Sequence, residues 1–218
     1  KWALAFKKSA NAKKVATSIP VIRDINLLSR DLYEELKSSS EFDFHYERNG
    51  LMMYYKSDKV GEEEWEVGKT AIKAGLHAEH LTSMEAIRKF EPTADLNVKG
   101  AVYFDCDAHM TPSDFMPEMV KYLKLIGVEI LANEEVKDLE VSNQTISKVI
   151  TDKSSYDTDE VVMAAGSWSP LLTKKLGIKI PIQAGKGYRI NVERETNISI
   201  PAVLCEAKVA VTPMTGFT

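Results

Sequence analysis

Val161-Val-Met-Ala-Ala-Gly-Ser-Trp-Ser-Pro170 is the stretch that says most about the fold of this chain. It predicts a short apolar strand that ends in small residues and is followed at once by the start of a helix. A parallel strand that runs into small residues and a helix N-terminus allows close approach of a nucleotide's phosphates. A buried strand with a tight turn would give the same pattern, so the spacing alone leaves both interpretations open.

The composition is ordinary for a globular protein. The 218 residues are 44% hydrophobic and 28% charged, enough for one large or two small domains at about 100–200 residues each. The net charge of −4, without a long run of Lys or Arg, argues against a nucleic-acid partner. No apolar run approaches the roughly 20 residues of a membrane span. Two cysteines, Cys106 and Cys205, cannot supply a disulfide framework, which favours a reducing compartment.

Four segments have the signature of helices. Apolar residues at helical spacing predict an amphipathic helix over 21–37, and a second helix is expected over 66–75, ending at Gly75. Thr82-Ser-Met-Glu85 fits a capping box for a short helix that ends before Pro92. Thr111-Pro-Ser-Asp114 predicts a helix with Thr111 as its cap, which Gly127 ends.

The strands are expected on either side of that last helix. A hairpin around Asn49-Gly50 is predicted within residues 42–55. Behind the helix we expect a strand at Val128–Leu131 and a small antiparallel sheet. That sheet has a hairpin of Val136–Val141 with Ile146–Thr151, and a third strand at Tyr156. The apolar strand Val161–Ala164 follows, and further strands are expected at Ile182–Val192, Ala202–Leu204 and Lys208–Val211. This order indicates an α/β unit with an antiparallel insertion.

Taken together, these motifs resemble the FAD-dependent amino-acid and amine oxidoreductases, a family that includes D-amino-acid dehydrogenases, glycine oxidase and sarcosine oxidase. The resemblance rests on Val161–Pro170, Leu176-Gly177, Pro181 and Gly185-Lys-Gly187, with Thr111–Phe115 and Val209–Pro213 in the same order. It is specific over residues 100–218 and looser over 1–99.

The resemblance implies a mixed α/β (α+β) fold: part of a Rossmann-like FAD-binding domain, plus a substrate domain with an antiparallel or mixed sheet. Residues 1–100 and 181–218 would belong to the substrate domain, and 101–180 to the middle of the FAD domain. The family's GxGxxG fingerprint has no match here, since Gly185-Lys-Gly187 is only GxG. The chain also lacks an initiator Met, so we expect an internal fragment truncated at both ends.

The resemblance also suggests which residues bind FAD. Val136 matches a valine whose backbone meets the adenine, and Ala164, Ala165 and Gly166 match the turn along the dinucleotide. Larger side chains there would hold the backbone away from the cofactor. Trp168 matches an aromatic position beside that turn. Lys186 and Gly187 match the crossing near the flavin ring, where a lysine could stabilise negative charge; a solvated lysine between turn glycines is the alternative.

Other candidate sites are weaker. Tyr54 and Tyr55 are assigned to a substrate pocket, although alternating core aromatics would look the same. Cys106 and His109 have CxxH spacing, but two ligands do not close a zinc site, and His77-Ala-Glu-His80 is not HExxH. We therefore expect no metal. No residue is assigned as a catalytic base.

The expected function is oxidation of a C–N bond in a small amino acid or amine, by hydride transfer to flavin. The partners would be that substrate and an electron acceptor, either oxygen or a membrane carrier. A cytoplasmic location is expected, with a peripheral position at the inner membrane as a variant. The alternatives are an FAD-dependent hydroxy-acid or glycerol-phosphate dehydrogenase, and a non-catalytic binding domain.

Overall fold

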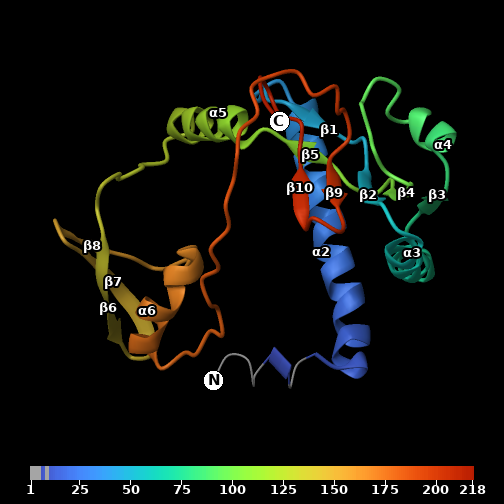
Figure 1. Cartoon of the computed structure of the whole chain (residues 1–218). Helices are drawn as coiled ribbons and strands as arrows, with labels where there is room; N and C mark the ends of the chain where they lie inside the picture. Colours follow the sequence, from blue (N-terminus) through green and yellow to red (C-terminus); the bar gives the residue numbers. More distant parts are fainter. Residues whose placement is uncertain (1–5, 8–9) are drawn as a thin grey trace. The chain divides into compact units, whose positions relative to one another are not determined.

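The computed structural model describes residues 6–7 and 10–218, which form two compact units (Figure 1). Unit 1 comprises the residues up to Ile126 together with Asn191–Thr218, and unit 2 is Gly127–Ile190. The division differs from the expected boundaries at 100 and 180. Strand β4 (Gly100–Phe104) pairs with strands of unit 1, which keeps the chain in that unit beyond residue 100.

A five-stranded mixed sheet forms the centre of unit 1. Its order is β10 (Val209–Val211), β9 (Ala202–Leu204), β2 (Leu51–Tyr55), β4 and β3 (Ala78–Leu81). β2 is parallel to β9, whereas every other neighbouring pair is antiparallel. The expectation of an antiparallel or mixed sheet is therefore confirmed.

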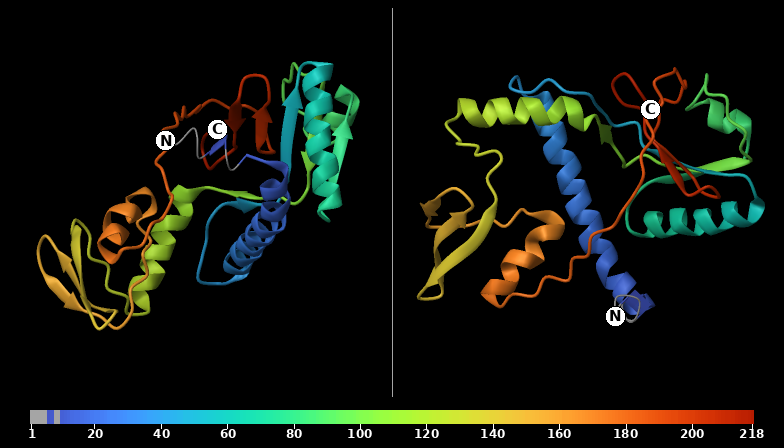
Figure 2. Two further views of the ribbon diagram at one scale, coloured as in Figure 1. Left: turned by 90° about the horizontal axis from the view of Figure 1, so that it is seen from below. Right: turned by 60° about the vertical axis from the view of Figure 1, so that its left-hand side comes forward.

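Two helices pack against this sheet and bury its core. α3 (Asp58–Lys73) contacts β2, β3 and β4, and α4 (Met84–Arg88) contacts β3 and β4; Figure 2 shows α3 running beside the strands. The core cluster is Met52, Tyr54, Leu81, Ile87, Ala101, Ile200 and Ala202. Ile200 and Ala202 come from the C-terminal segment, so the core is completed only by residues that follow unit 2.

The predicted hairpin around Asn49-Gly50 is wrong. β1 (Tyr46–Glu47) pairs with β5 (His109–Met110) in a separate two-stranded sheet, not with β2. Gly50 has φ +82°, and a Cβ there would lie 2.4 Å from the carbonyl oxygen of Phe104. The glycine therefore lets the chain pass tightly against β4 as it crosses from one sheet to the other.

The helices form where the sequence predicts them, with shifted starts. α2 spans Ala12–Ser38 and includes the expected 21–37 segment. α3 begins at Asp58, earlier than the expected residue 66, because the side chain of Ser57 caps it by accepting from the amide of Val60. In α4 the cap is Ser83 instead of Thr82. None of the described helices is both long and apolar enough to cross a membrane.

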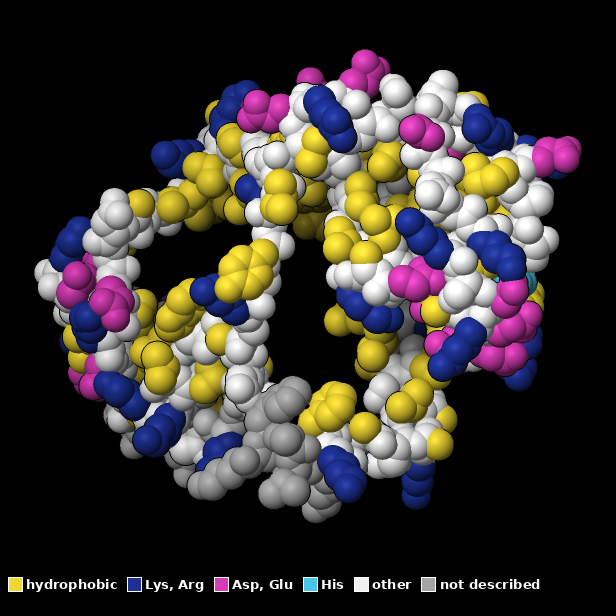
Figure 3. Space-filling view, in the orientation of Figure 1, with side chains coloured by type: hydrophobic (Ala, Val, Ile, Leu, Met, Phe, Trp, Pro, Cys, Tyr) yellow, Lys and Arg dark blue, Asp and Glu magenta, His cyan; other side chains and the backbone are white. Residues whose placement is uncertain are grey.

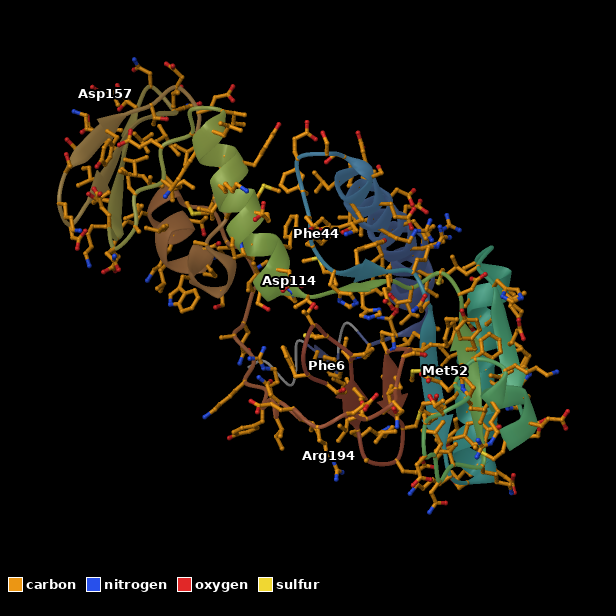
Figure 4. The ribbon with its side chains drawn as sticks, turned by 90° about the horizontal axis from the view of Figure 1, so that it is seen from above. Phe6, Phe44, Met52, Asp114, Asp157 and Arg194 are labelled. Atoms are coloured by element: carbon orange, nitrogen blue, oxygen red, sulfur yellow. The ribbon has the colours of Figure 1, made fainter. Side chains whose placement is uncertain are left out.

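The apolar face of α2 is largely exposed. Ile22, Ile25, Leu28 and Leu32 are each at least half exposed. Only the C-terminal end of the helix joins a core cluster, where Tyr33 and Leu36 pack against Phe42, Phe44 and Phe115. In Figure 4 Phe44 lies between α2 and α5 (Pro112–Leu125). The amphipathic pattern thus predicted the helix correctly but not the burial of its face.

Thr111 starts α5 but does not cap it with its side chain. Its hydroxyl instead accepts a hydrogen bond of 3.0 Å from the amide of Thr215. Asp114, expected to complete the cap, accepts from the Thr215 hydroxyl at 2.6 Å. The start of α5 is therefore tied to the C-terminal segment, and Gly127 follows the helix with φ +89° as expected.

A buried carboxylate holds the returning chain in unit 1. Glu91 is 1% exposed. Its oxygens accept from the amides of Ser199 at 2.9 Å and Ile200 at 2.6 Å, and from the Ser199 hydroxyl at 3.1 Å. Charged acceptors give the stronger protein hydrogen bonds, so Glu91 fixes residues 199–200 directly before β9.

Unit 2 contains the predicted antiparallel sheet. β6 (Val136–Ser142) and β7 (Thr145–Thr151) form the hairpin, and β8 (Ser155–Asp157) pairs with β7. Asn143 and Gln144 at the turn both have positive φ, 52° and 63°, as a two-residue type I′ loop requires. Three short helical segments follow: η1 (Gly166–Trp168), α6 (Ser169–Thr173) and η2 (Lys174–Leu176).

Three expected strands are absent from unit 2 and the segment that leaves it. No strand is assigned to Val128–Leu131, Val161–Ala164 or Ile182–Val192, and in the described part of the chain these segments belong to no sheet. A strand needs a hydrogen-bonded neighbour to satisfy its backbone, and β6–β8 pair only among themselves. No side-chain hydrogen bond caps η1 or α6 in the described structure.

Candidate functional site

A cleft of about 740 Å³ lies within unit 2, between the β6–β7 hairpin and the segment 161–175. Its size falls in the range of small-molecule sites, about 300–1,000 Å³. The lining is mainly apolar, with a few charged residues: Glu134, Glu135, Val136, Lys137, Leu139, Val149, Val161, Val162, Met163, Ala164, Ala165, Trp168, Leu171, Leu172 and Lys175.

Four of the seven residues predicted to bind the cofactor line this one cleft: Val136, Ala164, Ala165 and Trp168. They come from the start of β6 and from the chain on either side of Gly166. The fold therefore brings together residues that are about 30 positions apart in the sequence.

The small residues leave one wall of the cleft open. Gly166 has φ +51°, and a Cβ added there would meet no atom of the described residues within 4 Å. Next to it Trp168 is 70% exposed, which is unusual for so large an apolar ring. A turn without side-chain bulk beside a flat exposed indole suits van der Waals contact with a planar group.

The floor of the cleft is held by contacts between η2 and β6. Lys175 donates to the carbonyl of Lys137 at 2.8 Å and to the carboxylate of Asp138 at 2.9 Å. The hydrogen bond from Lys175 lowers the pKa of Asp138, so this carboxylate stays charged. Leu139, the next residue of β6, is 7% exposed and also lines the cleft. Lys175 thus anchors the helical segment and is not a free cation.

Acidic residues lie at the β6 end of the cleft. Glu134 accepts from the Thr151 hydroxyl at 2.6 Å and the Tyr156 hydroxyl at 2.8 Å. These hydrogen bonds lower the pKa of Glu134. Sequence reasoning missed Glu134 and Lys175 as lining residues. Glu134 lies two positions before Val136, which was an available signal, whereas Lys175 lies seven positions after Trp168.

Lys186 and Gly187 lie outside the lining of this cleft. They belong to a stretch without regular secondary structure. The ammonium group of Lys186 lies 5.3 Å from the centre of the Tyr188 ring, within the range of a cation–π contact. The structure therefore does not bring these two residues together with the four that line the cleft.

Tyr54 and Tyr55 lie in the core of unit 1, 1% and 4% exposed. The Tyr55 hydroxyl is 2.9 Å from Nε2 of His80. Burial raises the pKa of both phenols, so neither is suited to proton transfer near neutral pH. Their positions match the alternative interpretation of alternating core aromatics.

A family model described as "FAD dependent oxidoreductase" matches residues 7–218. The chain belongs to this family. The match covers nearly all of the chain, and the family's cofactor is the one that the sequence motifs predicted.

Curated relatives of this family member carry consistent names. A D-amino acid dehydrogenase from Helicobacter pylori (strain ATCC 700392 / 26695) is 31% identical over 214 residues, which cover 97% of this chain and 50% of the relative. One from Paramagnetospirillum magneticum is 24% identical, covering 93% and 49%. The chain spans about half the length of the curated relatives it matches.

Solved structures support the fold of this family member. Glycine oxidase from Bacillus cereus ATCC 14579 superposes with a TM-score of 0.61 and 25% identity, covering 70% of this chain and 42% of that one. L-proline dehydrogenase from P. horikoshii gives a TM-score of 0.69 at 21% identity, covering 87% and 52%. The expected mixed α/β class is confirmed.

Proposed function

We propose that this chain contributes to an FAD-dependent oxidoreductase that oxidises a C–N bond of a small amino acid or amine. The observation that carries the proposal is the cleft of unit 2, lined by Val136, Ala164, Ala165 and Trp168. The family resemblance assigns the same four residues to contact with FAD.

The residues of the cleft fit the nucleotide part of FAD. The backbone at Ala164–Gly166 is free of bulky side chains, so a dinucleotide could lie directly against it. The backbone of Val136 and the exposed ring of Trp168 would contact its planar base. Lys186 and Gly187 are proposed to lie at the crossing near the flavin ring, where the ammonium group would favour negative charge.

When bound, FAD supplies the acceptor for a hydride from the substrate carbon. The part played by this chain is to position the cofactor and to exclude side chains from its path. The relatives named D-amino acid dehydrogenase favour an amino acid over a hydroxy acid or glycerol phosphate as substrate. Oxygen or a membrane carrier would take the electrons, in the cytoplasm or at the inner membrane surface.

The proposal is tested with the protein at the length at which the cell produces it. We expect flavin absorbance after purification, and reduction of a dye acceptor with D-amino acids or sarcosine but not with 2-hydroxy acids. A colourless protein that takes up no added FAD would overturn the proposal. Turnover of 2-hydroxy acids alone would instead support the alternative substrate class.

A matched pair of variants tests the cleft itself. Ala165→Leu places a larger side chain in the lining and should weaken FAD binding, measured by quenching of flavin fluorescence. Ala132→Leu makes the same change at an exposed position of unit 2 outside the cleft and should leave binding unchanged. Equal binding by both variants would contradict the assignment of Ala165.

A further inference from the structure

Three potential metal ligands converge on the small β1–β5 sheet of unit 1. Each of His45, Glu47 and His109 offers one ligand atom, and these atoms all lie within 4.8 Å of one another. Nε2 of His45 is 3.5 Å from Oε1 of Glu47. This group has no part in the cleft of unit 2.

Strand geometry explains why the three residues meet. Residues i and i+2 of an extended chain point to the same side, which places His45 and Glu47 together. The register of the antiparallel pair sets His109 directly opposite Glu47, and opposite residues have Cβ atoms about 4.5–5.5 Å apart. The arrangement is therefore fixed by backbone pairing and not by chance contacts of long side chains.

The atoms of His45 and Glu47 that point away from the group are already hydrogen-bonded. Nδ1 of His45 is 2.8 Å from the hydroxyl of Thr111, a residue with no exposed surface. Oε2 of Glu47 accepts from the side-chain amide of Asn49 at 2.6 Å. Metal-binding histidines and carboxylates are usually oriented by such outer hydrogen bonds, and here they leave Nε2 and Oε1 facing inward.

His109 has no such partner. It is 9% exposed, and neither of its ring nitrogens makes a hydrogen bond in the described part of the structure. An orphaned buried polar group is costly and needs an explanation.

We propose that His45, Glu47 and His109 bind a divalent transition-metal ion, with Zn²⁺ as the best fit. Two imidazoles and one carboxylate match the donor preference of Zn²⁺, whereas Mg²⁺ and Ca²⁺ prefer oxygen ligands throughout. Donors bound tetrahedrally at about 2.0–2.1 Å lie about 3.4 Å apart, so small side-chain rotations would close the group. The site leaves a fourth position for water.

This group of ligands differs from the CxxH pattern of Cys106 and His109 in the sequence. His109 is a ligand in both readings, but Cys106 is outside the group. The other two ligands are Glu47 of β1 and His45, which directly precedes β1; both lie more than 60 residues before His109.

The test is Zn²⁺ titration of the full, untagged chain by calorimetry, with metal content measured after dialysis. We expect one equivalent per chain. Glu47→Gln keeps the size of the side chain, and His45→Phe keeps a planar ring; both residues are partly exposed. Each variant should weaken binding at least about tenfold. In ¹⁵N spectra, Zn²⁺ should shift the ring nitrogens of His45 and His109.

His77→Gln is the matched control. His77 also faces carboxylates, Glu79 at 3.7 Å and Asp105 at 3.4 Å, but it is 56% exposed. This variant should bind Zn²⁺ as the parent chain does, and so should Cys106→Ser. Absence of binding, or a stoichiometry and affinity unchanged in Glu47→Gln, would overturn the proposal. Loss of binding only in His77→Gln would do the same, because it would place the metal elsewhere.

Discussion

The central sheet of unit 1 and the cleft region of unit 2 have similar strand-like sequence patterns but different outcomes. In unit 1 β2 lies between β4 and β9, and Met52 and Tyr54 are almost completely buried. In unit 2 the apolar segment Val161–Ala164 pairs with nothing in the described residues, and Val162 is 90% exposed. An apolar run therefore indicates that a segment could be buried as a strand. Whether the strand forms depends on a neighbouring strand with which it can pair.

Exposed apolar side chains are also found elsewhere in unit 2. Trp168, Leu171, Tyr188 and Ile190 are each more than two-thirds exposed. Figure 3 shows hydrophobic side chains, in yellow, interspersed with charged ones at the surface. The outer turns of α2 in unit 1 behave in the same way, so the difference follows the presence of packing neighbours and not the unit as such.

The largest effect should come from removing the buried carboxylate of unit 1. Glu91→Ala leaves the buried amide of Ile200 and the part-buried amide of Ser199 without their carboxylate acceptor, and we expect a loss of about 4 kcal/mol. Amide hydrogen exchange of β9 and β2 measures it. Glu62→Ala, an exposed change on α3, should stay within about 0.5 kcal/mol. A loss below about 1 kcal/mol for Glu91→Ala would contradict the role given to this residue.

Truncating one apolar side chain in each region sharpens the comparison directly. Ile87 has no exposed surface, and Ile87→Ala should cost about 2–5 kcal/mol. Val162→Ala should change stability by about 0.5 kcal/mol or less, because Val162 is solvated. Urea unfolding of the two variants decides this, and comparable losses would mean that Val162 is buried in solution.

Glycine substitutions give a smaller contrast. A Cβ at Gly100 would lie 2.1 Å from the Tyr55 hydroxyl and 2.7 Å from the Leu81 carbonyl oxygen. At Gly187 it would meet nothing within 4 Å among the residues that the structure describes. We expect Gly100→Ala to cost about 1–3 kcal/mol and Gly187→Ala about 0.5 kcal/mol or less, by thermal unfolding. A cost for Gly187→Ala as large as that for Gly100→Ala would show a close neighbour at Gly187.

The smallest effect concerns the charged end of the cleft. Hydrogen bonds from Thr151 and Tyr156 lower the pKa of Glu134 below its ordinary value of 4.5. Their stabilising contribution is therefore present above pH 4.5 and is lost as the pH falls through the lower, folded value. Tyr156→Phe should move the pKa of Glu134 back toward 4.5, as followed by NMR titration. An unchanged titration would mean that the phenol does not contact Glu134.

Local features were predictable from the sequence, and long-range pairings were not. The start of α5 at Thr111-Pro112 and the turn at Asn143-Gln144 depend on adjacent residues. The pattern at Asn49-Gly50 was misleading because β1 pairs with β5, far along the chain. Glu47 and His109 are far apart in the sequence for the same reason, so their proximity in space could not be predicted.

The residues predicted to bind the cofactor do not all lie together, for a related reason. One turn is flanked by Ala164, Ala165 and Trp168, so these residues are close together because they are close in sequence. The β6–β7 hairpin then places Val136 beside them. Lys186 lies in a stretch without regular secondary structure, and its contact with the Tyr188 ring does not tie it to the cleft. Its predicted place near the flavin depended on the family resemblance alone.

The parallel pairing of β2 with β9 also has a consequence for biosynthesis. The register joins Met52 to Ala202, so the ribosome must add 150 residues before β2 meets this neighbour. At about 5–20 residues per second, the interval is roughly 8–30 s. Throughout it one edge of β2 is unpaired, and such edges promote aggregation. The nascent chain should therefore depend on chaperones until Ala202–Leu204 has emerged from the exit tunnel.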